Sequence, residues 1–166
     1  MESEQQPSMV VGGAVSLNRA SLVPPARILV IEDNPSDVFL LDRALKKQNL
    51  RFELMHLLDG SEALAFVRRQ EAYREAAIPD LILLDVNLPK CTGEEISREI
   101  QASQHLAGVP VCVWTSSRSR RDQSLFQGLG VVRFITKPSG LDQFMEIGII
   151  IKDVLVGFQS RRMAMI

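Results

Sequence analysis

The stretch DLILLDVNLPK, residues 80–90, decides the fold. Four consecutive apolar residues end abruptly at Asp85, and Asn87 and Pro89 follow as turn-forming residues. A run this short and this apolar is typical of a strand buried on both faces, as in a parallel sheet covered by helices. Asp85 then stands at the carboxyl end of the strand, where open parallel sheets bind their ligands. The residue is either part of a site or only the cap of the following turn.

Short apolar runs alternate with amphipathic segments along the rest of the chain. Strands are predicted over residues 27–31, 51–57, 80–85, 109–115 and 131–136. Helices are predicted from Pro35, capped by Asn34, to about Gln48; from Asp59 and Glu62 through Val67; around Ile96 and Ile100; through Leu125 and Leu129 to a closing Gly130; and from Ser139 to about Phe158. Each parallel crossover needs a helix, so the prediction is an α/β fold. It is a flavodoxin-like, doubly wound, five-stranded parallel sheet of order 2-1-3-4-5 with five helices.

One domain is expected for 166 residues. Residues 1–26 lack periodicity and contain Gly12, Gly13, Pro24 and Pro25, so we interpret them as a flexible leader. The folded domain is predicted at 27–158, and a short C-terminal tail at 159–166.

Composition excludes several classes of protein. A net charge of −1 and 5% aromatic residues argue against a generic nucleic-acid binder. Cys91 and Cys112 have neither metal-site spacing nor a disulfide framework, which favours a reducing, cytoplasmic location. Lys152 and Asp153 interrupt the last apolar stretch, which falls short of the roughly 20 apolar residues of a membrane span. We therefore expect neither DNA binding nor a membrane segment.

The predicted strand order brings four strand ends together. Strands 1, 3, 4 and 5 become neighbours, and their carboxyl ends carry Glu32 and Asp33, Asp85, Thr115, and Lys137. Three clustered carboxylates repel one another unless a cation joins them, and hard oxygen ligands suit Mg²⁺ (or Mn²⁺). A lysine and a hydroxyl opposite them suit an oxyanion. This combination predicts an aspartyl phosphate, because phosphoryl transfer needs mainly positioning and charge neutralisation.

Each residue receives an expected role. Asp85 is the nucleophile, and Asp33 holds the metal ion while Glu32 acts mainly through water. The backbone carbonyl of Asn87 is a further candidate metal ligand. His56 and His105 lie far apart in the predicted fold, so neither is assigned a role.

Four motifs, each at a strand exit, resemble one known family. They are EDN at 32–34, DVNLP at 85–89 with Gly93 beyond it, TS at 115–116 and KP at 137–138. The chain resembles the receiver domain of bacterial two-component response regulators from Arg27 to about Val156. Through NPSD, DLILLDVNLP and TKPSGLDQF it is most similar to single-domain regulators paired with phytochrome-type kinases.

The resemblance implies that a histidine kinase, or a phosphorelay histidine protein, donates its phosphoryl group to Asp85. The chain would then be a signalling protein, and the only reactions it catalyses would be its own phosphotransfer and dephosphorylation. Thr115 matches the family's phosphate-sensing hydroxyl, and Phe134 its aromatic switch, although a strand-end threonine and a core phenylalanine would look the same. Asn87, Ser116 and Ser117 would flank the phosphoryl group, or be ordinary polar loop residues.

Two predicted surfaces have a composition that suggests contact with a partner. One is apolar and the other is basic. Met145, Ile149 and Val156 form a second apolar stripe on the last helix, beside the core-facing stripe that includes Leu141 and Phe158. The stripe predicts a homodimer through helix 4, strand 5 and helix 5, unless the leader covers it. The start of helix 4 carries Arg118, Arg120 and Arg121, with Arg133 nearby. This basic face is either solvated or docks an acidic partner.

Two other functions compete with the phosphorylated receiver. A degenerate receiver acting as an unphosphorylated adaptor would not need the acidic cluster, Thr115 and Lys137. A flavodoxin-like cofactor protein would place the acidic EDNPSD segment, residues 32–37, against a flavin phosphate, which it would repel. A DNA-binding regulator would require an effector domain beyond the last helix.

Overall fold

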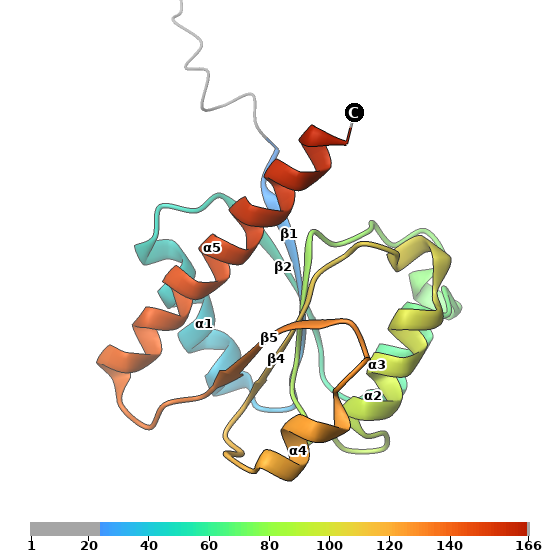
Figure 1. The fold of residues 1–166 in the computed structure, drawn as a ribbon, viewed down its shortest axis with the longest axis horizontal. Coiled ribbons are helices and arrows are strands. Elements are labelled where there is room, and N and C mark those ends of the chain that lie inside the picture. The colour runs from blue at the N-terminus through green and yellow to red at the C-terminus, as the bar shows by residue number, and fades with distance from the viewer. Residues whose placement is uncertain (1–23, 166) are drawn as a thin grey trace, which may run out of the picture.

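The computed structural model describes residues 24–165. Strands and helices alternate along this part of the chain (Figure 1). The elements are β1 (Ala26–Ile31), α1 (Pro35–Lys47), β2 (Phe52–Leu57), α2 (Gly60–Val67), β3 (Leu81–Leu84), α3 (Gly93–Ala102), β4 (Val111–Thr115), α4 (Arg120–Leu125), β5 (Val131–Thr136) and α5 (Leu141–Ala164), with short 3₁₀ turns at Glu71–Tyr73 and Gln104–Leu106.

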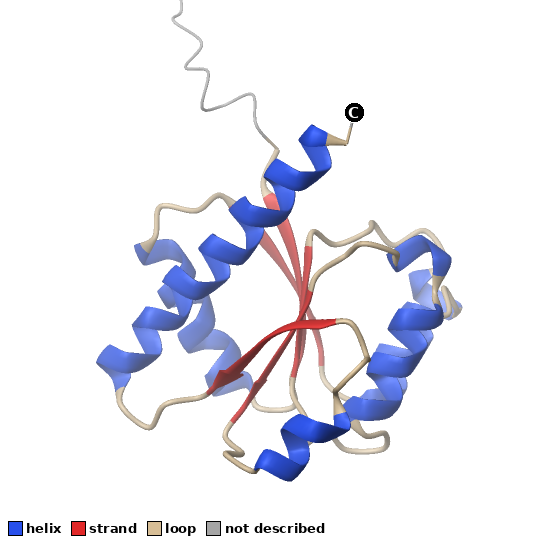
Figure 2. Ribbon diagram, viewed as in Figure 1, coloured by secondary structure: helices blue, strands red, loops and turns tan. Residues whose placement is uncertain are grey.

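The strands form one parallel sheet of order β2-β1-β3-β4-β5, as predicted. Figure 2 shows the sheet in the middle of the molecule with helices on both sides. All four residues of β3 and all five of β4 are buried, which explains why these strands read as unbroken apolar runs. The predicted fold class and strand order are confirmed.

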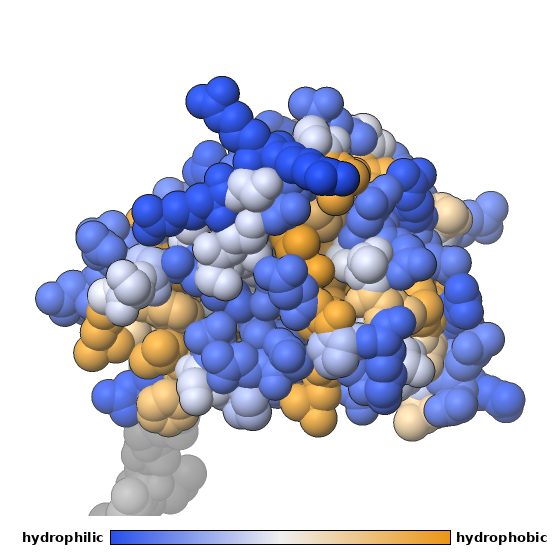
Figure 3. Space-filling model, turned by 90° about the horizontal axis from the view of Figure 1, so that it is seen from below, coloured by the Kyte–Doolittle hydropathy of each residue, from blue (hydrophilic) through white to orange (hydrophobic). Residues whose placement is uncertain are grey.

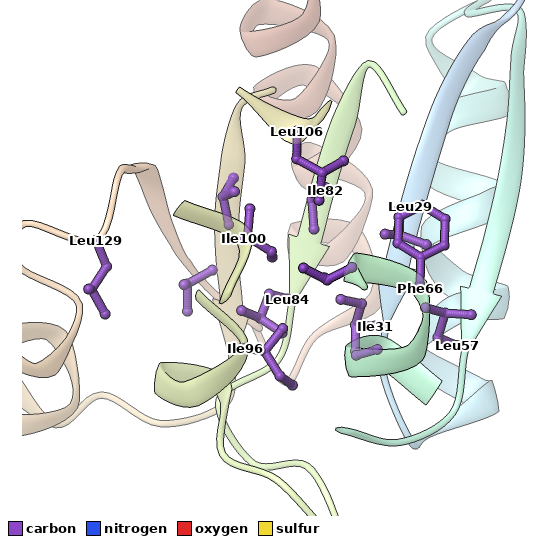
Figure 4. Packing of buried hydrophobic residues seen from close by; sticks show 14 of the residues in the cluster. Leu29, Ile31, Leu57, Phe66, Ile82, Leu84, Ile96, Ile100, Leu106 and Leu129 are labelled. Carbon is purple, nitrogen blue, oxygen red and sulfur yellow. The ribbon is translucent and has the colours of Figure 1, made fainter. Parts of the chain in front are cut away.

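Two apolar clusters cover the two faces of the sheet. On one face, α2 and α3 pack over the strands together with Phe126 and Leu129 (Figure 4). On the other face, α1 and α5 pack over residues that include Trp114. The loops that follow the strands all lie at one edge, at the bottom of Figure 1, where they gather the polar ends of the strands.

α1 and α5 lie unusually close where Gly148 meets Ala44. A Cβ atom on Gly148 would stand 2.3 Å from the Ala44 carbonyl oxygen, so only glycine fits there. Lys152 of α5 donates a hydrogen bond to the Gln48 carbonyl, 3.1 Å away, and so satisfies the end of α1. The two helices therefore form one tightly packed layer.

Several predicted boundaries are wrong. α4 ends at Leu125 rather than near Gly130, because Gly128 and Gly130 adopt positive φ angles of 76° and 73° and turn the chain. Leu129 is buried although it lies outside the helix. An apolar residue is needed there for packing, and its distance of four residues from Leu125 resembled the spacing of a helix. The predicted leader ended at residue 26, yet Ala26 opens β1; residues 1–23 lie outside the described part of the chain.

The last helix also differs from the prediction. It is capped by Gly140 instead of Ser139 and continues to Ala164, so the residues predicted as a tail are helical through that position. Arg161 and Arg162 in its final turn favour this extension, because cations stabilise the negative end of the helix dipole. Leu141 was expected in the core but is 61% exposed, since the helix begins beyond the edge of the sheet.

None of the helices in residues 24–165 is long and apolar enough to cross a membrane.

Candidate functional site

The carboxyl edge of the sheet holds the polar residues that were predicted to meet there. The Glu32 N–H donates to the Leu57 carbonyl at 3.0 Å, and the Asp85 N–H donates to the Ile31 carbonyl at 3.0 Å. These bonds continue the β1–β2 and β1–β3 pairing by one residue, so they fix the backbone positions of Glu32 and Asp85. The Lys137 N–H donates to the Thr115 carbonyl at 2.8 Å in the same way.

Three carboxylates form a compact cluster at this edge. Oxygen atoms of Glu32, Asp33 and Asp85 all lie within 4.8 Å of one another. Glu32 and Asp85 are buried, whereas Asp33 is exposed. Hard, negatively charged oxygen donors at this spacing fit Mg²⁺ or Mn²⁺, which take carboxylates and complete their shell with water. An acidic cluster that can bind a divalent metal ion is therefore present.

Lys137 is the cation of the site. Its Nζ atom donates to Asp85 Oδ2 at 2.9 Å and to Glu32 Oε2, and it lies 3.0 Å from Asp37 Oδ2. Its side chain is 7% exposed. The ammonium is also 4.6 Å from the ring centre of Trp114, which is buried as expected. The buried lysine is thus surrounded by three carboxylates and an indole ring.

Asp37 and His56 make contacts with site residues that were not predicted from the sequence. Asp37 was interpreted only as a favourable charge in the first turn of α1. His56, which received no role, lies with Nε2 2.7 Å from the Glu32 carbonyl and so supports the loop after β1. The signal for Asp37 is its position in the helical turn that follows a strand exit, because that turn faces the edge of the sheet.

The switch and flanking residues lie on the α4 side of the site. Thr115 is fully buried, and its hydroxyl accepts a hydrogen bond from the Ser117 N–H at 3.2 Å. The Ser117 hydroxyl donates to Asp122, while Ser116 is exposed. Phe134 packs edge-on against Phe126, with ring centres 5.8 Å apart.

Asn87 contacts the predicted nucleophile directly. Its N–H donates to Asp85 Oδ1 at 3.1 Å, while Lys137 binds the other carboxylate oxygen. Gly93 lets α3 approach this loop, because a Cβ atom there would stand 2.8 Å from the Asp85 carbonyl oxygen. Both oxygen atoms of Asp85 are therefore held in fixed positions.

The protonation of Glu32 and Lys137 follows from their burial. Burial raises the pKa of Glu32 to about 7, against the opposing effect of its bond with Lys137. Burial alone would lower the pKa of Lys137, but its bonds with Glu32 and Asp85 raise it above the ordinary value. The lysine therefore stays charged, while Glu32 exchanges a proton near neutral pH.

We expect the free energy of unfolding of the metal-free protein to fall as pH rises from about 4.5 to about 7. Glu32 binds its proton below about 7 in the folded chain but only below its ordinary 4.5 when unfolded, so the folded state holds more protons in this window. The stabilisation is complete below the lower value and lost above the upper one. Urea unfolding over a pH series in chelator measures it.

The control for this pH effect is Glu32→Gln, which cannot titrate. Its unfolding free energy should lack the part of the slope that belongs to Glu32. Identical slopes in wild type and variant would contradict the raised pKa.

Comparison with known families decides the class of this site. The chain matches the family model described as the response regulator receiver domain over residues 28–148. The chain belongs to this family. The receiver resemblance predicted from the four motifs is confirmed, and these motifs surround the acidic cluster and Lys137.

The receiver is similar to phytochrome response regulators. It is 37% identical to Response regulator Rcp1 of Synechocystis sp. over 124 residues, which covers 75% of this chain and 84% of Rcp1. The crystal structure of the phosphorylated cyanobacterial phytochrome response regulator RcpA superposes with a TM-score of 0.74 at 36% identity, covering 80% of this chain and 94% of RcpA. The Mn²⁺-bound form of Rcp1 gives a TM-score of 0.69 at 36% identity, covering 75% and 89%. The predicted likeness to phytochrome-linked regulators is confirmed.

Proposed function

We propose that Asp85 accepts a phosphoryl group from a histidine kinase and that the receiver works as a phosphorelay response regulator. One observation carries the proposal: the Lys137 ammonium bonds to Asp85, 2.9 Å away, beside a cluster of carboxylates suited to a divalent metal ion. A nucleophile, a fixed cation and a metal site in contact are the requirements of phosphoryl transfer. RcpA, which is similar to this chain, has been crystallised in a phosphorylated form.

In the proposed step, an oxygen of the Asp85 carboxylate attacks the phosphorus atom of a phosphohistidine. The P–N bond breaks as the P–O bond forms, and the imidazole leaves and takes up a proton. Lys137 pairs with an oxygen of the transferred group. Glu32, Asp33, Asp85 and the Asn87 carbonyl would hold Mg²⁺ or Mn²⁺, which neutralises charge on the phosphoryl oxygens.

Exposed apolar side chains border the entrance of the site, where a kinase would dock. Phe39 on α1 and Leu141 at the start of α5 are each 61% exposed. They border neighbouring grooves, one of which is also lined by Asp37 and Lys137. Figure 3, which looks onto this edge of the molecule, shows hydrophobic areas among hydrophilic ones. The similarity to Rcp1 and RcpA supports a phytochrome-type kinase as the donor.

Phosphorylation is proposed to move Thr115 and Phe134 toward the site and to shift α4, β5 and α5. Thr115 would donate its hydroxyl proton to the phosphoryl group, and its displacement toward the site would stretch the bond that it accepts from the Ser117 N–H, which loosens the loop before α4. Beryllofluoride with Mg²⁺ mimics the phosphoryl group and tests this. We expect backbone amide shifts on α4, β5 and α5 that Mg²⁺ alone does not cause. If the amide shifts of α4, β5 and α5 did not change, the switch would be rejected. If the amide shifts around Asp85 did not change as well, Asp85 would be rejected as the phosphoacceptor.

The exposed side of α5 supports the proposed homodimer. Ile149 and Val156 are 48% and 53% exposed, whereas Met145 packs partly against the α1 side of the core. Asp142, Glu146 and Asp153 are exposed on the same ridge as Ile149 and Val156, because their spacings of four and seven residues keep them on one face of the helix. The exposed arginines of the loop before α4, of α4 itself and of β5 carry the complementary charge, which supports a contact between two copies through this face; they are Arg118, Arg120, Arg121 and Arg133.

We expect Ile149→Glu to dissociate the dimer, because it places a charge in the centre of an apolar contact. Sedimentation at micromolar concentration measures the change. Leu58→Glu is the matched control, since Leu58 is 50% exposed and follows β2, which lies at the opposite edge of the sheet from β5. A monomeric wild type, both as the full chain and as a version starting at Pro24, would reject the dimer. A dimer formed only by the shortened version would indicate that the leader covers the ridge.

A further inference from the structure

Asp37 contacts the site lysine without belonging to the acidic cluster. Its Oδ2 atom lies 3.0 Å from Lys137 Nζ, and its side chain is 21% exposed. The cluster that can hold a metal ion consists of Glu32, Asp33 and Asp85. The position of Asp37 is fixed locally, because its N–H donates to the carbonyl of the helix cap Asn34 at 3.2 Å.

The other two partners of Lys137 have further duties in the proposed reaction. Glu32 and Asp85 both bind the ammonium, but both also belong to the metal cluster, and Asp85 becomes the acyl phosphate. When a metal ion and a phosphoryl group occupy the site, these two carboxylates are drawn into other bonds. Among the contacts of Lys137 in the described chain, Asp37 is then the carboxylate that keeps its charge for the lysine.

The ion pair of Asp37 and Lys137 lies in the groove that leads to the site. Asp37 and Lys137 line the same groove, together with Asn34, Arg118 and Ser139. Asp37 comes from α1 and Lys137 from the segment after β5, so their ion pair joins two elements on either side of the entrance. The Trp114 ring also contacts the ammonium, with its centre 4.6 Å from Lys137 Nζ.

We propose that Asp37 is a positioning residue that holds the Lys137 ammonium at the groove while the phosphoryl group is transferred. This inference rests on the proposed function. Without the carboxylate of Asp37, the ammonium has only Glu32 and Asp85 as ion-pair partners in the described chain. Both are engaged elsewhere once the metal ion and the phosphoryl group occupy the site, so no carboxylate then holds the lysine at the groove. Asp37 therefore acts on the reaction through Lys137 and not through contact with the phosphoryl group.

The kinetic test uses the full chain, acetyl phosphate and saturating Mg²⁺. Asp37→Asn keeps the shape of the side chain and removes its charge, and we expect phosphorylation to slow about tenfold, while Asp37→Glu restores most of the rate. Asp42→Asn, on the same helix and paired with exposed Lys46, is the matched control and should match wild type. In a Lys137→Met background the Asp37 change should have no further effect.

Two kinetic results would overturn the inference. One is that the Asp37→Asn variant is phosphorylated as fast as the wild type or faster. The other is that Asp37→Asn slows phosphorylation as much in the Lys137→Met background as it does in the wild type. A second readout does not depend on phosphorylation: the ¹⁵N signal of the Lys137 ammonium in Mg²⁺ and beryllofluoride should broaden by hydrogen exchange in Asp37→Asn but not in Asp42→Asn. If the wild type gained no phosphoryl group, the proposed function would be refuted, but the ¹⁵N signal of Lys137 would still show whether Asp37 holds the ammonium. If that signal were the same in Asp37→Asn and in the wild type, the role of Asp37 as a positioning residue would be refuted.

Discussion

Incubated with acetyl phosphate and Mg²⁺, the protein is expected to gain one phosphoryl group, and the Asp85→Asn variant is expected to gain none. The reason is that Asp85 follows β3, between β1 and β4, so its carboxylate bonds to Lys137 and lies beside the carboxylates of Glu32 and Asp33 that would hold the metal ion. An amide at this position keeps the size of the side chain but cannot form the acyl phosphate. Intact-mass measurement reads the result directly.

Two controls sharpen this experiment. Asp142→Asn removes an exposed carboxylate on α5 and should leave the mass gain unchanged. A chelator in place of Mg²⁺ should suppress the gain in every form of the protein, since the carboxylates would lack their counter-ion. A phosphoryl group on the Asp85→Asn variant would assign the reaction to another residue and refute the proposed site.

The Lys137→Met variant should lose about 3–5 kcal/mol of stability in metal-free solution at neutral pH. The change leaves buried Glu32 and Asp85, with Asp37 beside them, without the cation that all three contact. An uncompensated buried charge costs far more than an exposed one, and the methionine fills the space without replacing the bonds. Urea unfolding followed by circular dichroism measures the loss.

Mg²⁺ should recover part of this stability, because an ion that binds only the folded state raises the free energy of unfolding by mass action. The Lys90→Met variant is the control: it breaks the ion pair with Asp59, in which the lysine is 62% exposed, and should change stability little. A Lys137→Met protein as stable as wild type without metal would show that the carboxylates do not need their cation.

The sequence predicted the members of the site because each follows a strand. Glu32, Asp33, Asp85, Thr115 and Lys137 end apolar runs, and the strand order then requires them to meet. Hydrophobic period and turn chemistry are local properties, so they can be interpreted without a structure.

The details that sequence missed depend on how distant elements approach each other. The pair of Asp37 with Lys137 exists because the start of α1 faces the segment after β5. The position of Asp37 after a strand exit points to this edge of the sheet, but not to Lys137 as its partner. Leu129 has the spacing of a helix residue, yet it is buried from a turn after α4 ends. Leu141 continues the apolar period of α5 but lies past the edge of the sheet, where no layer is available to cover it.

Trp114 has a practical consequence for work on this protein. It is the single tryptophan of the chain, it is buried, and its ring lies 4.6 Å from the Lys137 ammonium. Indole emission responds to nearby charge, so the intrinsic fluorescence of the protein arises beside a charged group whose bonding partners change when the site fills. The protein therefore carries an optical reporter of its own occupancy, and titrations with metal ions or phosphoryl mimics can be followed in real time without an attached dye.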